Sequence, residues 1–93
     1  MPRFPVAHIH EQGNDMIIVP LESSFGQQSS QAQQETIAEL QVRANAAGLR
    51  GTVVVVWDSG GRMAFIGPQL WRPFLEGLNL QLVAANLNKE IFW

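Results

Sequence analysis

Residues 52–66, Thr-Val-Val-Val-Val-Trp-Asp-Ser-Gly-Gly-Arg-Met-Ala-Phe-Ile, decide the fold of this chain. The β-branched run 52–57 is typical of a strand, because branched side chains are crowded in a helix and pack well on a pleated sheet. The glycines within 58–61 supply the positive φ angles that a tight hairpin turn requires. We therefore predict a hairpin in which 62–66 returns as the second strand and Gly67-Pro68 ends it.

The segment before this hairpin has helical periodicity over residues 30–47. Its apolar residues recur at steps of three and four and so share one face of a helix: Ile37, Leu40, Ala44 and Ala47. Ser30 is the expected N-cap with Gln33 as its capping-box partner, and Gly48 suits the left-handed position after the helix. Residues 21–29 are expected to form a surface loop, which is a candidate binding loop because long loops often carry function.

The two ends of the chain predict further elements. Residues 4–10 and 16–19 are typical of a strand hairpin, in which Pro5 confines the first strand to the edge of a sheet. Near the other end, 69–77 predicts a short helix and 80–85 predicts a last strand.

The order of these elements predicts the fold class. From residue 16 onward it is strand, helix, strand, strand, helix, strand, which matches the ferredoxin-like β-α-β-β-α-β order. We therefore predict an α+β fold, with an antiparallel sheet, two helices and an N-terminal edge strand. A chain of 93 residues fits a single domain spanning residues 1–93.

The predicted strands are apolar on both faces, which bears on self-association. Two helices on one side of an antiparallel sheet would leave its second face open, and an open face should alternate polar and apolar residues. That alternation is missing from 16–19, 53–57, 63–66 and 80–85. We therefore expect a second copy of the chain, or else the terminal segments, to cover the second face, and we favour a homo-oligomer.

Charge and composition exclude several classes of partner. The formal net charge is −2 and the six basic residues are scattered, so no basic stripe is available for the phosphates of a nucleic acid. No apolar run approaches the ~20 residues of a membrane span, and no signal peptide is recognisable. The chain has no cysteine, which excludes thiolate chemistry. We expect a cytoplasmic protein with no nucleic-acid partner and no membrane partner.

His8 and His10 form the strongest metal-site pattern. Residues two apart on a strand point to the same side, so both imidazoles could reach one ion, with Glu11, Asp15 or Glu22 adding an oxygen ligand. Two histidines do not make a site by themselves, and two polar side chains on the open face of an edge strand are the favoured explanation. The sequence therefore assigns no metal ligand and no cofactor.

Catalytic motifs are also missing from the sequence. None of the five serines lies in a Gly-x-Ser-x-Gly elbow, and residues 58–62 join two strands instead of leading into a helix as a phosphate loop does. We therefore assign no catalytic residue and interpret the protein as non-enzymatic. A small enzyme or metal-binding domain that uses His8 and His10 is the alternative.

Aromatic residues give the candidates for a partner or self-association surface: Trp71, Phe74, Phe92 and Trp93. Aromatic side chains are enriched at interfaces, although core filling explains Trp71 and its neighbours as well. The ending Ile91-Phe92-Trp93 is too apolar for a frayed tail, so we expect it to dock on the sheet or on a partner subunit.

The stretches 8–21, 53–58 and 63–66 resemble short uncharacterised proteins encoded on bacterial plasmids and integrative elements. The resemblance implies a cytoplasmic bacterial accessory protein of a mobile element, and it carries over no functional residue. The sequence as a whole predicts a small non-enzymatic accessory or protein-interaction domain that self-associates.

Overall fold

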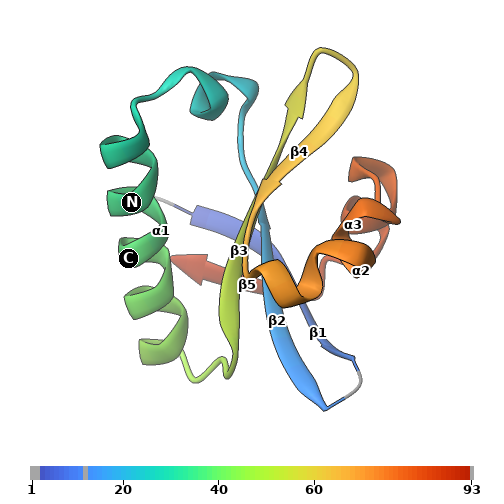
Figure 1. Cartoon of the computed structure of the whole chain (residues 1–93). Helices are drawn as coiled ribbons and strands as arrows, with labels where there is room; N and C mark the ends of the chain where they lie inside the picture. The colour runs from blue at the N-terminus through green and yellow to red at the C-terminus, as the bar shows by residue number, and fades with distance from the viewer. Residues whose placement is uncertain (1–2, 12, 93) are drawn as a thin grey trace.

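The structure, a computed structural model, describes residues 3–11 and 13–92, and in them a five-stranded sheet lies between two layers of helix (Figure 1). The strands are β1 (Arg3–Glu11), β2 (Asn14–Pro20), β3 (Thr52–Ser59), β4 (Arg62–Ile66) and β5 (Lys89–Phe92). The helices are α1 (Ser30–Ala46), α2 (Arg72–Glu76) and α3 (Leu80–Ala85), with short 3₁₀ helices η1 (Ser23–Gln27) and η2 (Gln69–Trp71).

The sheet is mixed, with strand order β4-β3-β2-β1-β5. Strands β1 and β2 form an antiparallel hairpin, as do β3 and β4, and β5 pairs antiparallel with β1. Strands β2 and β3 are parallel, because α1 crosses over one face of the sheet and returns the chain to the end where β2 began. The α+β class and both hairpins are confirmed. The antiparallel sheet is wrong, and the ferredoxin-like order is not confirmed.

The predicted strand at 80–85 is also wrong, because this segment forms α3. The Asn79 side chain caps the helix by accepting a hydrogen bond from the Leu82 amide at 2.8 Å. Leucine and alanine, which dominate the segment, favour a helix, and Val83 is the residue that it buries. The last strand is β5 instead. The short helix predicted at 69–77 is present as η2 followed by α2.

Strand β1 is not at the edge of the sheet, contrary to the prediction from Pro5. Its first half, from Arg3 to Val6, pairs with β5, and its second half, from Ala7 onward, pairs with β2. Continuing the β1–β2 register by two residues would bring Pro5 opposite Pro20. Proline has no N–H to donate, so the ladder with β2 ends before this pair and β5 takes over on the other side.

Side chains alternate between the two faces of the sheet and build two cores. On the α1 side the core includes Val6, Ile17, Val19, Val53 and Val55 from the strands, with Leu40 and Ala44 from the helix. On the opposite side it includes Ala7, Met16, Ile18, Val54 and Val56, with Trp71, Leu75 and Val83 from the helical segments. The helices therefore cover both faces, which corrects the expectation that both would lie on one face (Figure 1). The apolar strands are explained within one chain.

Helix α1 is confirmed, with its start displaced by one residue. Ser29, and not Ser30, is the N-cap, and its hydroxyl accepts a hydrogen bond from the Ala32 amide at 3.1 Å. Gln33 does not close a capping box. Its side-chain amide donates to the carbonyl of Phe25 at 2.9 Å and so fastens η1 to the helix. Gly48 has φ +87° and ends the helix as expected.

None of the helices in residues 3–11 and 13–92 is both long enough and apolar enough to cross a membrane.

Candidate functional site

The two histidines of β1 are held by different partners. The ring Nε2 of His8 lies 2.7 Å from the carbonyl oxygen of Arg50, just before β3. The ring Nδ1 of His10 lies 2.6 Å from Oδ1 of Asp15, its direct neighbour across the β1–β2 hairpin. Each imidazole therefore has one nitrogen engaged with a separate oxygen. This geometry fixes the rings in the hairpin and does not converge them on a common point.

The His10–Asp15 pair brings two ionisable side chains together at this end of the hairpin. The hydrogen bond from His10 has the largest effect and lowers the pKa of the Asp15 carboxyl. Partial removal from water is the next largest effect and opposes it, and the charges of His10, His8 and Arg50 lower the pKa further. The Asp15 carboxylate accepts this hydrogen bond from the His10 ring. The His10 side chain is largely exposed and that of Asp15 is half-buried, so the pair is in contact with water and not in a closed cavity.

Within the described part of the chain, no group of three or more His, Asp or Glu side chains is placed to hold a metal ion. Of the ligands considered with the histidines, Asp15 is bonded to His10, and Glu22 lies before η1. Polar and charged side chains are also missing from the buried interior of these residues. A water-excluded site with a titratable group is therefore not built by residues 3–11 and 13–92.

The three aromatic interface candidates that the structure describes lie in different surroundings. Trp71 is 9% exposed in the core beneath η2, and Phe74 packs against the same core while half-buried. Phe92 is 59% exposed on β5, where the Arg3 guanidinium lies 5.8 Å from its ring centroid. Trp93 lies outside the described residues. The structure does not bring the described three together, and their role at an interface stays a prediction.

Strand β5, the last described element, is docked on its own chain. Strand β5 pairs with β1, and Ile91 is fully buried on the α1 side. The Asn88 side chain extends this pairing by accepting from the His8 amide at 2.8 Å and donating to the His8 carbonyl at 3.0 Å. Residues up to Phe92 therefore pack on the sheet of their own chain.

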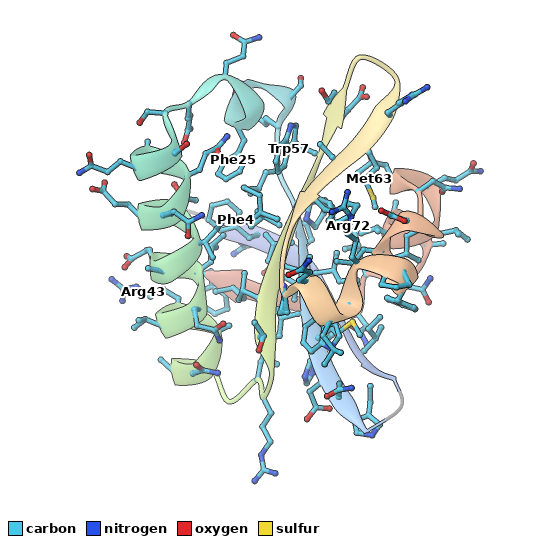
Figure 2. The ribbon with its side chains drawn as sticks, viewed as in Figure 1. Phe4, Phe25, Arg43, Trp57, Met63 and Arg72 are labelled. Carbon is cyan, nitrogen blue, oxygen red and sulfur yellow. The ribbon has the colours of Figure 1, made fainter. Side chains whose placement is uncertain are left out.

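The loop 21–29 contains a short helix and contributes a side chain to the core. Its centre is η1, and Phe25 of this turn is buried against Trp57 on the α1 face (Figure 2).

A hollow of about 380 Å³ lies between η1 and the start of β1, bordered by Pro5, Pro20 and Thr36. A second hollow of about 380 Å³ lies on the opposite face, where α2 and α3 are too short to cover Ile9 completely.

Strand β4 is the apolar edge of the sheet. Its side chains alternate between the two faces, and Met63, Ala64, Phe65 and Ile66 are all half-buried. Met63 points toward the α2–α3 side in Figure 2. Strand β4 stands at the end of the strand order, with β3 on one side and no described strand on the other. A hollow of about 520 Å³ lies beside it, between β4 and η2.

The turn between β3 and β4 determines which backbone groups face outward. Gly60 and Gly61 have φ +65° and +91°, as in a two-residue type I′ turn, which closes on the hydrogen-bonded pair Ser59–Arg62. Hydrogen-bonded pairs alternate along an antiparallel ladder, so Ala64 and Ile66 also bond to β3. The N–H and C=O groups of Met63 and Phe65 therefore point away from the sheet.

The free edge was missed when the sequence was read for side-chain chemistry alone. The signal is present in the sequence, because 63–66 carries apolar residues on both faces and no charge. What the sequence lacks is the strand order, which shows that this strand lies at the end of the sheet.

No protein-family model matches the chain, and no curated protein or solved structure matches it.

Proposed function

We propose that this protein is a small non-enzymatic interaction domain that self-associates. The observation that carries the proposal is the edge strand β4, in which the side chains of residues 63–66 are apolar on both faces and half-buried, and only Arg62 beside the turn is charged. An edge strand of this kind offers a row of backbone donors and acceptors to another strand, and natural sheets protect such edges with charges or proline unless they are used.

The opposite edge of the sheet, strand β5, differs from β4 in its charge. Strand β5 carries Lys89 and Glu90, both exposed, and Glu90 forms an ion pair with Arg3 at 3.5 Å. Charged residues on an edge strand are a recognised defence against unwanted pairing. One edge strand of the same sheet thus carries two adjacent charged residues, whereas residues 63–66 of the other edge strand carry none.

The surroundings of the histidines favour a non-enzymatic role over the alternative. A metal-binding or enzymatic function would use His8 and His10 together, whereas their ring nitrogens bond to Arg50 and Asp15 separately. The resemblance to short proteins of bacterial plasmids and integrative elements supports a role as a cytoplasmic accessory protein of a mobile element.

Sedimentation equilibrium of the purified chain at micromolar concentrations tests the proposal. Self-association predicts a mass well above the 10.3 kDa of one chain, increasing with concentration. A monomer at the highest concentration reached would contradict it. A zinc titration by calorimetry tests the alternative, which predicts sub-micromolar binding that is lost in His8→Ala and His10→Ala.

A further inference from the structure

We infer that β4 pairs antiparallel with β4 of a second copy of this chain, with Met63 of one copy opposite Phe65 of the other and Ala64 on the two-fold axis. This inference rests on the proposed self-association and assigns it a surface, a partner and a register.

The length of β4 and the direction of its free hydrogen-bonding groups match in this register. In an antiparallel pair of β4 strands that overlap along all five residues, Arg62 lies opposite Ile66, Met63 opposite Phe65, and Ala64 opposite Ala64. Met63 and Phe65 are the residues whose backbone groups point outward. They therefore form two equivalent hydrogen-bonded pairs, with about four hydrogen bonds between the chains.

Strand β5 fails the same test. Pro5 lacks an N–H, so its pair with Glu90 is not hydrogen-bonded, and the backbone groups of Glu90 point away from β1. Full overlap of two copies of Lys89–Phe92 would place Glu90 opposite Ile91, whose groups point toward β1. Two β5 strands therefore cannot form hydrogen-bonded pairs over their full length, whereas two β4 strands can.

The side chains fit the same register. Met63 and Phe65 lie on the α2–α3 face, where the thioether of one copy would contact the ring of the other, a favourable pairing across strands. The two Arg62 side chains are kept apart, since each lies opposite an isoleucine. Ala64 and Ile66, on the α1 face, bring small and branched apolar groups to the two-fold axis.

The symmetry of this pairing closes the assembly. Two copies joined through β4 form one continuous sheet around a two-fold axis, which leaves a β5 strand at each outer edge. Lys89 and Glu90 are exposed on those edges and oppose further strand addition. Pairing of β4 with the β5 of another copy would instead repeat without end and produce filaments. The arrangement of charges therefore favours a closed dimer.

A cysteine at the axis tests the register directly, because the natural chain has none. The two Ala64 residues would form a non-hydrogen-bonded pair with a Cα–Cα distance of about 4.5 Å, which lies within the range that a disulfide can bridge. We expect Ala64→Cys to form a disulfide-linked dimer within minutes of mild oxidation. Val42→Cys, on the exposed side of α1, is the matched control and should cross-link at least about tenfold more slowly.

A proline at the outward-facing backbone tests the edge without a cross-link. The N–H of Met63 does not bond to β3, so Met63→Pro should keep the hairpin and block pairing with a second copy. We expect the dissociation constant of the dimer to rise by at least about tenfold, with an unchanged circular dichroism spectrum. Glu90→Pro removes an outward N–H from β5 in the same way and should leave the dimer intact.

These results separate the inference from the proposed function. A dimer that persists in Met63→Pro, together with slow cross-linking of Ala64→Cys, would show that the chain associates through another surface and would overturn the β4 pairing alone. A wild-type chain that sediments as a monomer would overturn both.

Discussion

The ring of Phe25 meets the ring of Trp57 edge to face, with centroids 5.1 Å apart and an angle of 62° between the ring planes (Figure 2). Phe25 comes from η1 and Trp57 from β3, so this contact holds the connection between β2 and α1 against the sheet. Aromatic pairs in this geometry stabilise a fold beyond the area that they bury. The loop is therefore part of the core on the α1 face.

Phe25→Ala should lower the free energy of unfolding by about 3–5 kcal/mol, because Phe25 is 4% exposed and its removal leaves a cavity beside Trp57. Urea denaturation followed by circular dichroism measures the change. Phe92→Ala, at a ring that is 59% exposed, is the control and should cost much less. Equal losses in the two variants would mean that the Phe25–Trp57 contact contributes little.

Gly51→Ala should destabilise the fold strongly. Gly51 has φ +121°, and a β-carbon at this position would clash with the backbone carbonyl oxygen of Asp15 in β2. Both the backbone strain and the clash act in the same direction, so we expect a loss of at least about 2 kcal/mol. Gly77→Ala has an ordinary negative φ and 3.5 Å to the nearest atom, and its melting temperature should stay close to that of the wild type. A Gly51→Ala protein as stable as the wild type would contradict this account.

Gln41→Ala should loosen α1 from the start of β3. The Gln41 amide donates to the Gly51 carbonyl and accepts from the Val53 amide, both at 2.9 Å. Leaving these backbone groups without a partner should cost about 1–3 kcal/mol. Hydrogen exchange of the Val53 amide should accelerate in the variant, whereas Gln31→Ala, at an exposed position on α1, should leave it unchanged. Unchanged protection of Val53 in Gln41→Ala would show that the clamp does not restrain β3.

Asp15→Asn should remove a pH-dependent part of the stability. Hydrogen bonding by His10 lowers the pKa of folded Asp15 below its ordinary value of 3.8, so the unfolded chain binds this proton first as the pH falls. The stabilisation is therefore present above about pH 4 and is lost as the pH falls through the folded pKa. The difference in unfolding free energy between wild type and Asp15→Asn should be fully present above about pH 5 and shrink as the pH falls below about pH 4. A difference that grows on acidification would have the wrong sign for this linkage.

The local elements were predictable because each depends on neighbouring residues. The turn at Gly60-Gly61 and the C-terminal end of α1 at Gly48 follow from positive φ, and both are confirmed. The prediction for 80–85 was wrong because a short segment of five apolar residues and Gln81 is compatible with either a buried strand or a short helix. Its helix depends on Asn79, whose capping role becomes evident only once the helix is known.

The strand order could not be read from the alternation of residues, because alternation does not distinguish parallel from antiparallel neighbours. The unbroken valine run 53–56 is nevertheless typical of a central strand with helices on both faces, and this is its position in the structure. Because the strand order was unknown, the sequence did not show that Met63 and Phe65 lie on an edge strand. Their outward backbone follows from the turn, but their place at the end of the sheet follows from the crossover through α1.

The division of β1 between two partners has a consequence for how the chain folds. The first half of β1, from Arg3 to Val6, has no strand partner until residues 89–92 are synthesised, and these are the last described part of the chain. Until they emerge, the nascent sheet has a second unprotected flank, and the hydrogen bonds of Asn88 to His8 join groups 80 residues apart. Contacts of such long sequence separation slow folding, because the entropy of closing the loop is lost before any contact compensates for it. Pairing of β5 with β1, and not formation of either hairpin, should therefore be the step that limits the rate of folding during synthesis.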